Sequence, residues 1–229
     1  MRDFDEKKSE TCAADEVSDA HGRFITFEGG EGCGKSTQIR LLAERLRAQG
    51  LQVLLTREPG GTALAEQIRA LVREIGEDPP NARAETLLFL ASRAQLVENV
   101  VRPALAAGTW VLCDRFADST FAYQGYGRGL NLAELKALNA FATGGLVPDR
   151  TILLDVPPET AAARLRAREQ TTQTAADRME RAGDDFHARL KAGFLELAAA
   201  EPARFAVIAA EGTVENVAEK VWSSIRHML

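Results

Sequence analysis

The stretch GGEGCGKS, residues 29–36, contains four glycines, one lysine and one serine. It follows the apolar run FITF (24–27), which predicts a β-strand, and precedes TQIRLLAERLRAQG (37–50), whose apolar residues recur at helical spacing. Glycines concentrated between a strand and a helix are typical of a loop that bends tightly and points its amide groups inward. The arrangement therefore predicts an anion-binding loop at the end of a strand.

The spacing Gly29-x-x-x-x-Gly34-Lys35-Ser36 matches the phosphate-binding loop of nucleotide-binding proteins. In such a loop the lysine reaches the β- and γ-phosphates, the serine hydroxyl can ligate Mg²⁺, and the helix N-terminus adds its dipole. The sequence therefore predicts that a nucleoside triphosphate binds at this loop, at residues Gly29, Gly30, Glu31, Gly32, Cys33, Gly34, Lys35, Ser36 and Thr37.

Four further apolar runs predict strands at 52–58, 109–114, 150–156 and 204–210, in addition to the one at 23–28. Helical periodicity separates them and no hairpin signal occurs, which favours a parallel sheet covered on both faces. We expect one α/β domain over 23–229, with the three-layer P-loop NTPase fold and a five-stranded parallel sheet. Residues 1–22 are polar and acidic, and we expect a disordered tail there.

The helices are predicted from periodicity and from their end signals. One begins near Ala63 with a broad apolar face, and a long one runs from about Ala82 to Val101, stopping before Pro103. The glycines in the second half of 115–131 indicate a loop. Capping residues start two more helices, at Asn131 with Glu134 and at Thr213.

Composition limits the partners of the chain. The 229 residues carry a net charge of −5, so we expect neither nucleic acid nor an anionic membrane surface as a partner. No apolar run is long enough to span a bilayer and no secretion signal is present, which predicts a cytoplasmic protein. The three cysteines form no CxxC pair, which argues against a zinc site or a disulfide framework. We interpret Cys33 as a small residue that fills the loop.

Two predicted strands end in aspartate, at Asp114 and Asp155, and the pattern alone does not choose which of them serves Mg²⁺. Arginine suits phosphate binding because its planar fork stays charged and donates hydrogen bonds in pairs. A solvated helix face is the alternative for every arginine, and it is the stronger interpretation for Arg40, Arg45 and Arg47. The candidates for phosphate binding are Arg57, Arg93, Arg115, Arg128, Arg164, Arg166, Arg168 and Arg178.

Several segments in order carry a resemblance: TREPGGT, LLFLASRAQLV, DRFADSTFAYQGYGRG and LLDVPPETAAARLRAR. From about Arg23 to the C-terminus the chain resembles the bacterial thymidylate kinases, which are nucleoside monophosphate kinases. The resemblance implies transfer of the γ-phosphoryl group of ATP to dTMP with Mg²⁺, giving dTDP for dTTP synthesis. It also implies a homodimer.

By the same resemblance, Phe89 stacks on thymine and Arg93 bonds its carbonyl edge. Glu31 lies near the sugar 3′-hydroxyl and Tyr123 packs against the deoxyribose. The "DR" pair favours Asp114 over Asp155 as the metal ligand, together with Ser36. The full dTMP site that the family implies is Glu31, Arg57, Phe89, Arg93, Arg115, Thr120, Tyr123 and Gln124.

Some members of the family carry the catalytic arginine inside the phosphate loop, at the position of Gly32, and others supply it from a lid. This chain resembles the second group, with a lid at about 164–180 that is longer and less charged than the family pattern; it also has Ala209 where an aspartate is expected. The expected catalytic residues are Lys35, Arg115, Arg164, Arg166 and Arg168. The alternatives are a kinase of another monophosphate or nucleoside, and an NTPase switch that binds a protein.

Overall fold

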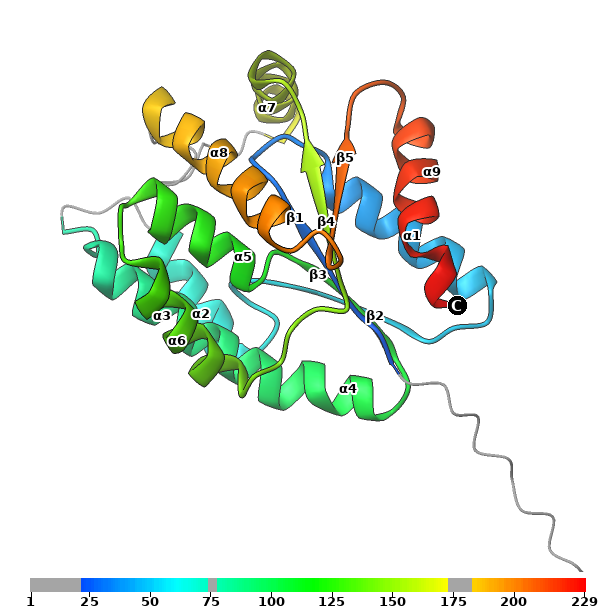
Figure 1. Cartoon of the computed structure of the whole chain (residues 1–229), viewed down its shortest axis with the longest axis horizontal. Helices are drawn as coiled ribbons and strands as arrows, with labels where there is room; N and C mark the ends of the chain where they lie inside the picture. The colour runs from blue at the N-terminus through cyan, green and yellow to red at the C-terminus, as the bar shows by residue number, and fades with distance from the viewer. Residues whose placement is uncertain (1–21, 74–77, 173–182) are drawn as a thin grey trace, which may run out of the picture.

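The computed structural model describes residues 22–73, 78–172 and 183–229, so the predicted tail lies outside the described residues except for residue 22. Five strands form one parallel sheet in the order β2-β3-β1-β4-β5 (Figure 1). Each predicted strand is present, with ends within one residue of the prediction. The strands are β1 (Phe24–Glu28), β2 (Val53–Arg57), β3 (Trp110–Asp114), β4 (Arg150–Asp155) and β5 (Phe205–Ala209).

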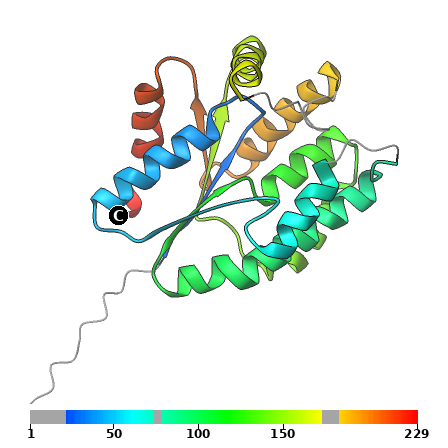
Figure 2. The same cartoon turned by 180° about the vertical axis from the view of Figure 1, so that it is seen from behind.

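Helices cover both faces of this sheet, which confirms the predicted three-layer fold (Figures 1 and 2). One face carries α1 (Lys35–Ala48) and α9 (Val214–Ile225), with η3 (Arg226–Met228) at the end of the chain. The other layer contains α2 (Ala63–Arg73), α3 (Ala82–Leu96), η1 (Val97–Val101), α4 (Arg102–Ala106), α5 (Ala117–Thr120), η2 (Phe121–Gly127), α6 (Leu132–Thr143) and α8 (Asp184–Ala200).

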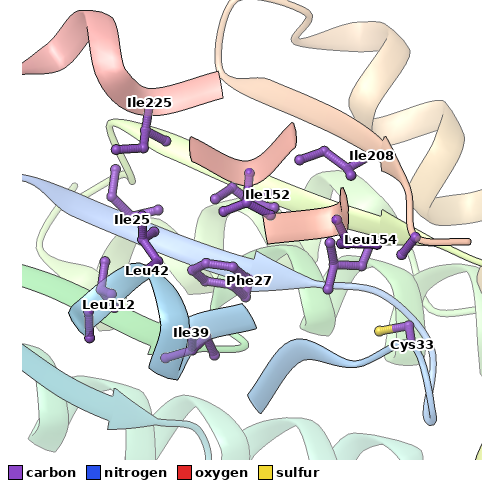
Figure 3. Close-up of a cluster of buried hydrophobic side chains, with 14 of the residues drawn as sticks. Ile25, Phe27, Cys33, Ile39, Leu42, Leu112, Ile152, Leu154, Ile208 and Ile225 are labelled. Atoms are coloured by element: carbon purple, nitrogen blue, oxygen red, sulfur yellow. The ribbon is translucent and has the colours of Figure 1, made fainter. Parts of the chain in front are cut away.

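The remaining helix, α7 (Pro158–Thr172), follows β4 and lies against the glycine-rich loop. The main core lies between the sheet and the α1/α9 layer, where Phe27, Leu42 and Ile152 pack together (Figure 3). Cys33 belongs to this cluster and is buried, which agrees with its interpretation as a loop-filling residue. Two smaller clusters lie on the other face, under α8 and under η1.

Two of the predicted helix boundaries are wrong. The long helix does not stop before Pro103: the π-helical turn η1 leads directly into α4, where Pro103 lies in the first turn. A proline is tolerated there because its missing N–H is not needed at a helix start. The second half of 115–131, expected to be a loop, begins inside the π-helix η2, which continues to Gly127. Its glycines serve packing, since a Cβ on Gly127 would lie 2.5 Å from the Phe186 ring.

Both predicted N-caps are confirmed. Asn131 Oδ1 accepts hydrogen bonds from the backbone N–H groups at the start of α6, and Thr213 Oγ1 does the same for α9. The carboxyl ends of the strands meet at one edge of the sheet, so Glu28, Arg57 and Asp114 become neighbours there. Ligands of open parallel sheets bind at this edge, where the strand order reverses.

Candidate active site

The glycine-rich loop joins β1 to α1 at the centre of this edge. Gly29 has a φ of 131°, and a Cβ there would lie 2.5 Å from the Leu154 carbonyl oxygen, so the position requires glycine. Lys35 Nζ turns back over the loop and donates to the carbonyl oxygens of Gly29 (3.1 Å) and Gly30 (2.9 Å). The lysine charge is thus held beside a helix N-terminus, an arrangement that binds phosphate.

The two candidate metal ligands at the strand ends differ in their partners. Ser36 Oγ donates to Asp114 Oδ2 at 3.1 Å, so the loop hydroxyl and this carboxylate already lie side by side. Asp155 instead forms an ion pair with Lys191 at 2.8 Å. Hydroxyl and carboxylate oxygens are ligands that Mg²⁺ accepts, so the residues present fit the ion. Among the described residues no cluster of three or more His, Cys, Asp or Glu side chains could hold a metal alone.

Arg115 connects the loop to the acceptor side of the site. Its φ of 71° lies in the left-handed region, which directs the side chain back toward the loop. Nη1 donates to the Gly29 carbonyl oxygen (3.0 Å) and to Ser119 Oγ (3.2 Å), and Nη2 donates to Glu31 Oε1 at 2.5 Å. The Tyr123 hydroxyl donates to the same Glu31 oxygen at 3.3 Å. The loop carboxylate, the arginine and the tyrosine are therefore one hydrogen-bonded group.

Burial and the charges within this group change the pKa values of Glu31 and Tyr123. Burial alone would raise the pKa of Glu31, but the positive charges of Arg115 and Lys35 outweigh it and lower the pKa to about 2. Burial raises the pKa of Tyr123 well above its usual value. At neutral pH the site thus offers an ionised acceptor and a neutral phenol, which suits hydrogen bonding to a sugar hydroxyl.

A cavity of about 630 Å³ runs from the loop to α3 and brings together most of the predicted site. Phe89 lies at its α3 wall and Lys35 at its loop wall. The predicted site residues that line it are Glu31, Gly32, Gly34, Lys35, Ser36, Thr37, Arg57, Phe89, Arg93, Asp114, Arg115, Thr120, Tyr123, Gln124 and Arg164. Gly29, Gly30 and Cys33 shape the loop and are not part of the cavity lining.

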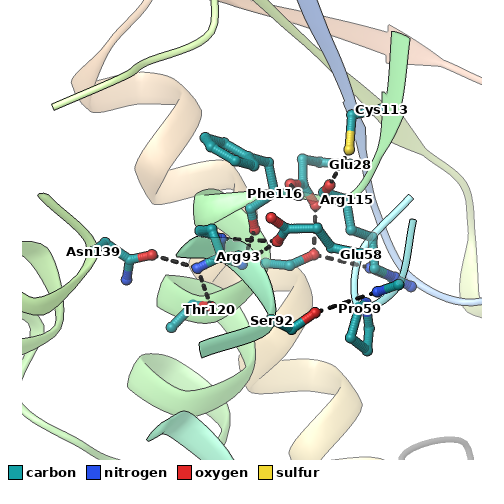
Figure 4. Close-up of polar contacts among 12 residues, drawn as sticks. Glu28, Glu58, Pro59, Ser92, Arg93, Cys113, Arg115, Phe116, Thr120 and Asn139 are labelled. Carbon is teal, nitrogen blue, oxygen red and sulfur yellow. Dashed lines mark hydrogen bonds and ion pairs between the residues drawn. The ribbon is translucent and has the colours of Figure 1, made fainter. Parts of the chain in front are cut away.

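Arg93 is enclosed by protein acceptors (Figure 4). Its Nε and Nη2 donate to Glu58 Oε2 at 2.8 and 2.5 Å, Nη1 donates to Thr120 Oγ1 (2.9 Å) and to Asn139 Oδ1, and Nη2 donates to the Phe116 carbonyl oxygen (3.0 Å). These five bonds equal the number of N–H groups on a guanidinium. A bond from Arg93 to a base, as the family resemblance implies, would require one of these partners to change.

The three predicted lid arginines have different surroundings. Arg164 lines the cavity, and its guanidinium donates to the Cys33 carbonyl oxygen (3.4 Å) and to the Ala210 carbonyl oxygen (3.0 Å). Arg166 is exposed and is not part of the cavity lining. The side chain of Arg168 and the rest of the predicted lid, residues 173–180, lie outside the described residues.

The sequence reasoning missed several residues that line the cavity, namely Glu58, Pro59, Arg69, Val72, Arg73, Ser119 and Leu165. Arg69 and Arg73 lie one turn apart on α2, and this i, i+4 spacing after the strand that ends in Arg57 is a signal that could have identified them. Glu58 directly follows Arg57, but nothing in its type or spacing indicates that it would hold Arg93. Arg128, which was among the candidates, pairs with Glu85.

No helix among the described residues has the length and apolar character needed to cross a membrane. A cytoplasmic location remains a prediction.

The family model for thymidylate kinase matches residues 27–221. Similar proteins include the thymidylate kinase of Synechococcus sp. (strain JA-2-3B'a(2-13)), 52% identical over 90% of this chain and 95% of its own, and that of Solidesulfovibrio magneticus, 50% identical over 90% and 100%. The crystal structure of thymidylate kinase from Ehrlichia chaffeensis matches with a TM-score of 0.73 and 32% identity, covering 90% of this chain and 99% of that one. The chain therefore belongs to the thymidylate kinase family, and it is a nucleoside monophosphate kinase that phosphorylates dTMP for dTTP synthesis with ATP as the phosphoryl donor.

Proposed function

We propose that the cavity holds ATP at its loop end and dTMP at its α3 end, so that the γ-phosphoryl group meets the dTMP phosphate between them. The observation that carries this proposal is the single cavity that both Lys35 and Phe89 line. Holding two substrates in line converts a bimolecular reaction into one within a complex, which is a large part of the catalysis available to a phosphotransferase.

On the donor side, Lys35 and the loop amides bind the phosphates. Arg115 lies between the loop and the acceptor end and adds positive charge where the transferred group develops negative charge. Of the two lid arginines whose side chains the structure describes, Arg164 is the better placed to join them, since it already contacts the loop at Cys33. No general base is required, because a phosphate monoester oxygen is itself a competent nucleophile.

We infer that Ser36 and Asp114 hold the Mg²⁺ that accompanies ATP. The support is their direct hydrogen bond and the engagement of Asp155 with Lys191. When bound, the ion neutralises charge on the phosphate oxygens. A site with two protein oxygens is usual for Mg²⁺, which keeps waters and substrate phosphates as its other ligands.

On the acceptor side, the half-buried Phe89 ring provides a flat apolar surface for the thymine base. Tyr123 and Glu31 approach the deoxyribose, where a 2′-hydroxyl would clash with the tyrosine and the 3′-hydroxyl would meet the carboxylate. Arg57 and Arg115 receive the dTMP phosphate. Arg57 is half exposed and pairs with Glu66 at 2.8 Å, so it can reach into the cavity from the end of β2.

Steady-state assays with ATP and Mg²⁺ against dTMP, dUMP, UMP, CMP and AMP test the acceptor site. We expect dTMP to give the highest kcat/KM. Lys35→Ala should reduce turnover to background, because no other cation touches both Gly29 and Gly30 among the described residues. Phe89→Ala should raise the KM for dTMP at least tenfold and leave the KM for ATP nearly unchanged. Full turnover in the Lys35 variant, or an unchanged dTMP KM in the Phe89 variant, would contradict the assignment.

We also propose a homodimer that forms through α2, α3 and α6. Helix α3 packs between the other two, and each of the three exposes at least one large apolar side chain. On α2, Leu64 and Leu71 are half exposed, whereas Ile68 is buried. The exposed apolar residues of this surface are Leu64, Leu71, Leu87, Leu138 and Phe141. Large apolar side chains exposed on neighbouring helices are a feature of interaction surfaces.

A further inference from the structure

Glu85 is a fully buried carboxylate on α3 that does not line the cavity but contacts Gln124, which does. It has no exposed surface and lies one helical turn before Phe89. Its Oε1 accepts a hydrogen bond from Gln124 Nε2 at 2.8 Å. Arg128 also donates to it, through Nε at 3.4 Å and Nη2 at 3.3 Å. Glu85 therefore acts as an acceptor toward both of these neighbours.

This contact determines which way the Gln124 amide points. An amide carries a donor and an acceptor on one carbon, and the two ends can exchange by a rotation of 180°. A carboxylate cannot donate, so the NH₂ group of Gln124 must face Glu85 and its Oε1 must face the other way. Gln124 lines the cavity, and its Oε1 has no partner in the described part of the chain, nor is it among the fully enclosed oxygens.

The hydroxyl group of the neighbouring residue Thr120 is held as a donor toward the cavity, whereas Gln124 presents an acceptor. Thr120 Oγ1 accepts a hydrogen bond from Arg93 Nη1 at 2.9 Å, which leaves the hydroxyl proton to donate elsewhere. Thr120 also lines the cavity. The cavity wall thus offers an acceptor from Gln124 beside a donor from Thr120.

We propose that Glu85 is a positioning residue that sets the base preference of the acceptor site by holding Gln124 Oε1 toward the cavity. Thymine and uracil present an N3–H donor flanked by carbonyl acceptors, which this wall matches. Cytosine presents an N3 acceptor beside an amino donor, which places acceptor against acceptor and donor against donor. A site built to bond a donor strongly rejects an analogue that lacks it.

The test compares Glu85→Gln with wild type, using kcat/KM for dTMP and for dCMP at saturating ATP. A glutamine at 85 can donate as well as accept, so the Gln124 amide becomes free to turn its NH₂ toward the base. We expect the dTMP:dCMP ratio to fall at least tenfold, through KM more than through kcat. Arg128→Gln is the matched control: it removes the hydrogen bonds from Arg128 to Glu85, leaves the bond from Gln124 in place, and should keep the wild-type ratio. General damage to the fold would lower kcat/KM for both substrates by the same factor and leave their ratio unchanged.

A folded Glu85→Gln variant whose ratio stays within twofold of wild type would overturn the proposal. If the variant does not fold, wild-type protein still tests it: calorimetry should show dTMP binding at least tenfold tighter than its N3-methyl derivative, and equal affinities would overturn it. The inference rests on the proposed base site beside Phe89. An unchanged dTMP KM in Phe89→Ala would contradict the proposed base site itself. A raised dTMP KM in Phe89→Ala together with an unchanged dTMP:dCMP ratio in Glu85→Gln would contradict only the role of Glu85.

Discussion

Glu28, the last residue of β1, is the carboxylate that holds the start of the acceptor segment. Its Oε1 accepts from the Phe116 N–H at 2.8 Å and its Oε2 accepts from Ser119 Oγ at 2.6 Å. Both donors follow Arg115, whose unusual backbone conformation they help to hold. The side chain is fully buried, and burial, with a smaller contribution from the charge of Asp118, raises the pKa of Glu28 from 4.5 to about 7.

A raised pKa in the folded state means that folding favours protonated Glu28. The stability it contributes is fully present below about pH 4.5 and is lost as the pH rises through about 7. Glu28→Gln removes this dependence because the amide keeps a carbonyl for Phe116 and can donate to Ser119 but never ionises. We expect the free energy of unfolding of the variant, relative to wild type, to rise by about 3 kcal/mol from pH 4.5 to pH 8. Urea denaturation at the two pH values measures this, and parallel pH curves for the two proteins would contradict it.

At the scale of single elements, the sequence predicts those helices and strands whose formation depends on the local pattern of residues. All five strands and the two caps at Asn131 and Thr213 follow from periodicity and from capping chemistry, both of which are local. The loop motif likewise identifies the phosphate site, because its glycines are required by the backbone conformation of the loop itself, within a few residues. The helix η2 could not be predicted in this way: its Gly127 packs against Phe186, almost sixty residues away, where a Cβ would clash, and a local pattern cannot separate such a packing glycine from a loop glycine.

The same limit applies to the site. A resemblance can indicate that Phe89 and Arg93 face one cavity, and they do. It cannot indicate that Arg93 is already saturated by Glu58, Thr120 and Asn139, because these residues come from three separate segments. Long-range partners of this kind follow only from the folded arrangement.

The helix α7 provides a test of which arginine assists catalysis. Arg164 and Arg166 are two residues apart, so they point to opposite sides of the helix, about 200° around its axis. Of these two arginines, Arg164 contacts the loop and lines the cavity, and Arg166 does neither among the described contacts. We expect Arg164→Ala to lower kcat/KM for ATP by at least about tenfold and Arg166→Ala to change it less than threefold. Equal losses of kcat/KM in the two variants would show that catalysis does not depend on which side of α7 carries the arginine.

At the scale of the whole molecule, the cavity and the proposed dimer surface lie on different sides of α3. The helix presents Phe89 and Arg93 to the cavity and Leu87 to solvent. A dimer through α2, α3 and α6 would therefore leave the cavity accessible while bracing the helix that holds the base. Catalysis and association would share one element without competing for the same side chains.

Phe141 is the sharpest probe of this surface, because 89% of it is exposed although it is a large aromatic residue. We expect wild type to sediment as a dimer at micromolar concentration and Phe141→Arg to sediment as a monomer, since a charge buried at an apolar interface without a partner is strongly unfavourable. Val207→Arg is the matched control: Val207 is half exposed on the edge strand β5, away from the three helices, and the variant should remain dimeric. A dimeric Phe141→Arg, or a Val207→Arg that also dissociates, would exclude this surface as the interface. Phe141 does not line the cavity, so the substitution removes no contact to dTMP. A lower dTMP affinity in the monomer would therefore report how much α3 depends on the partner subunit for support.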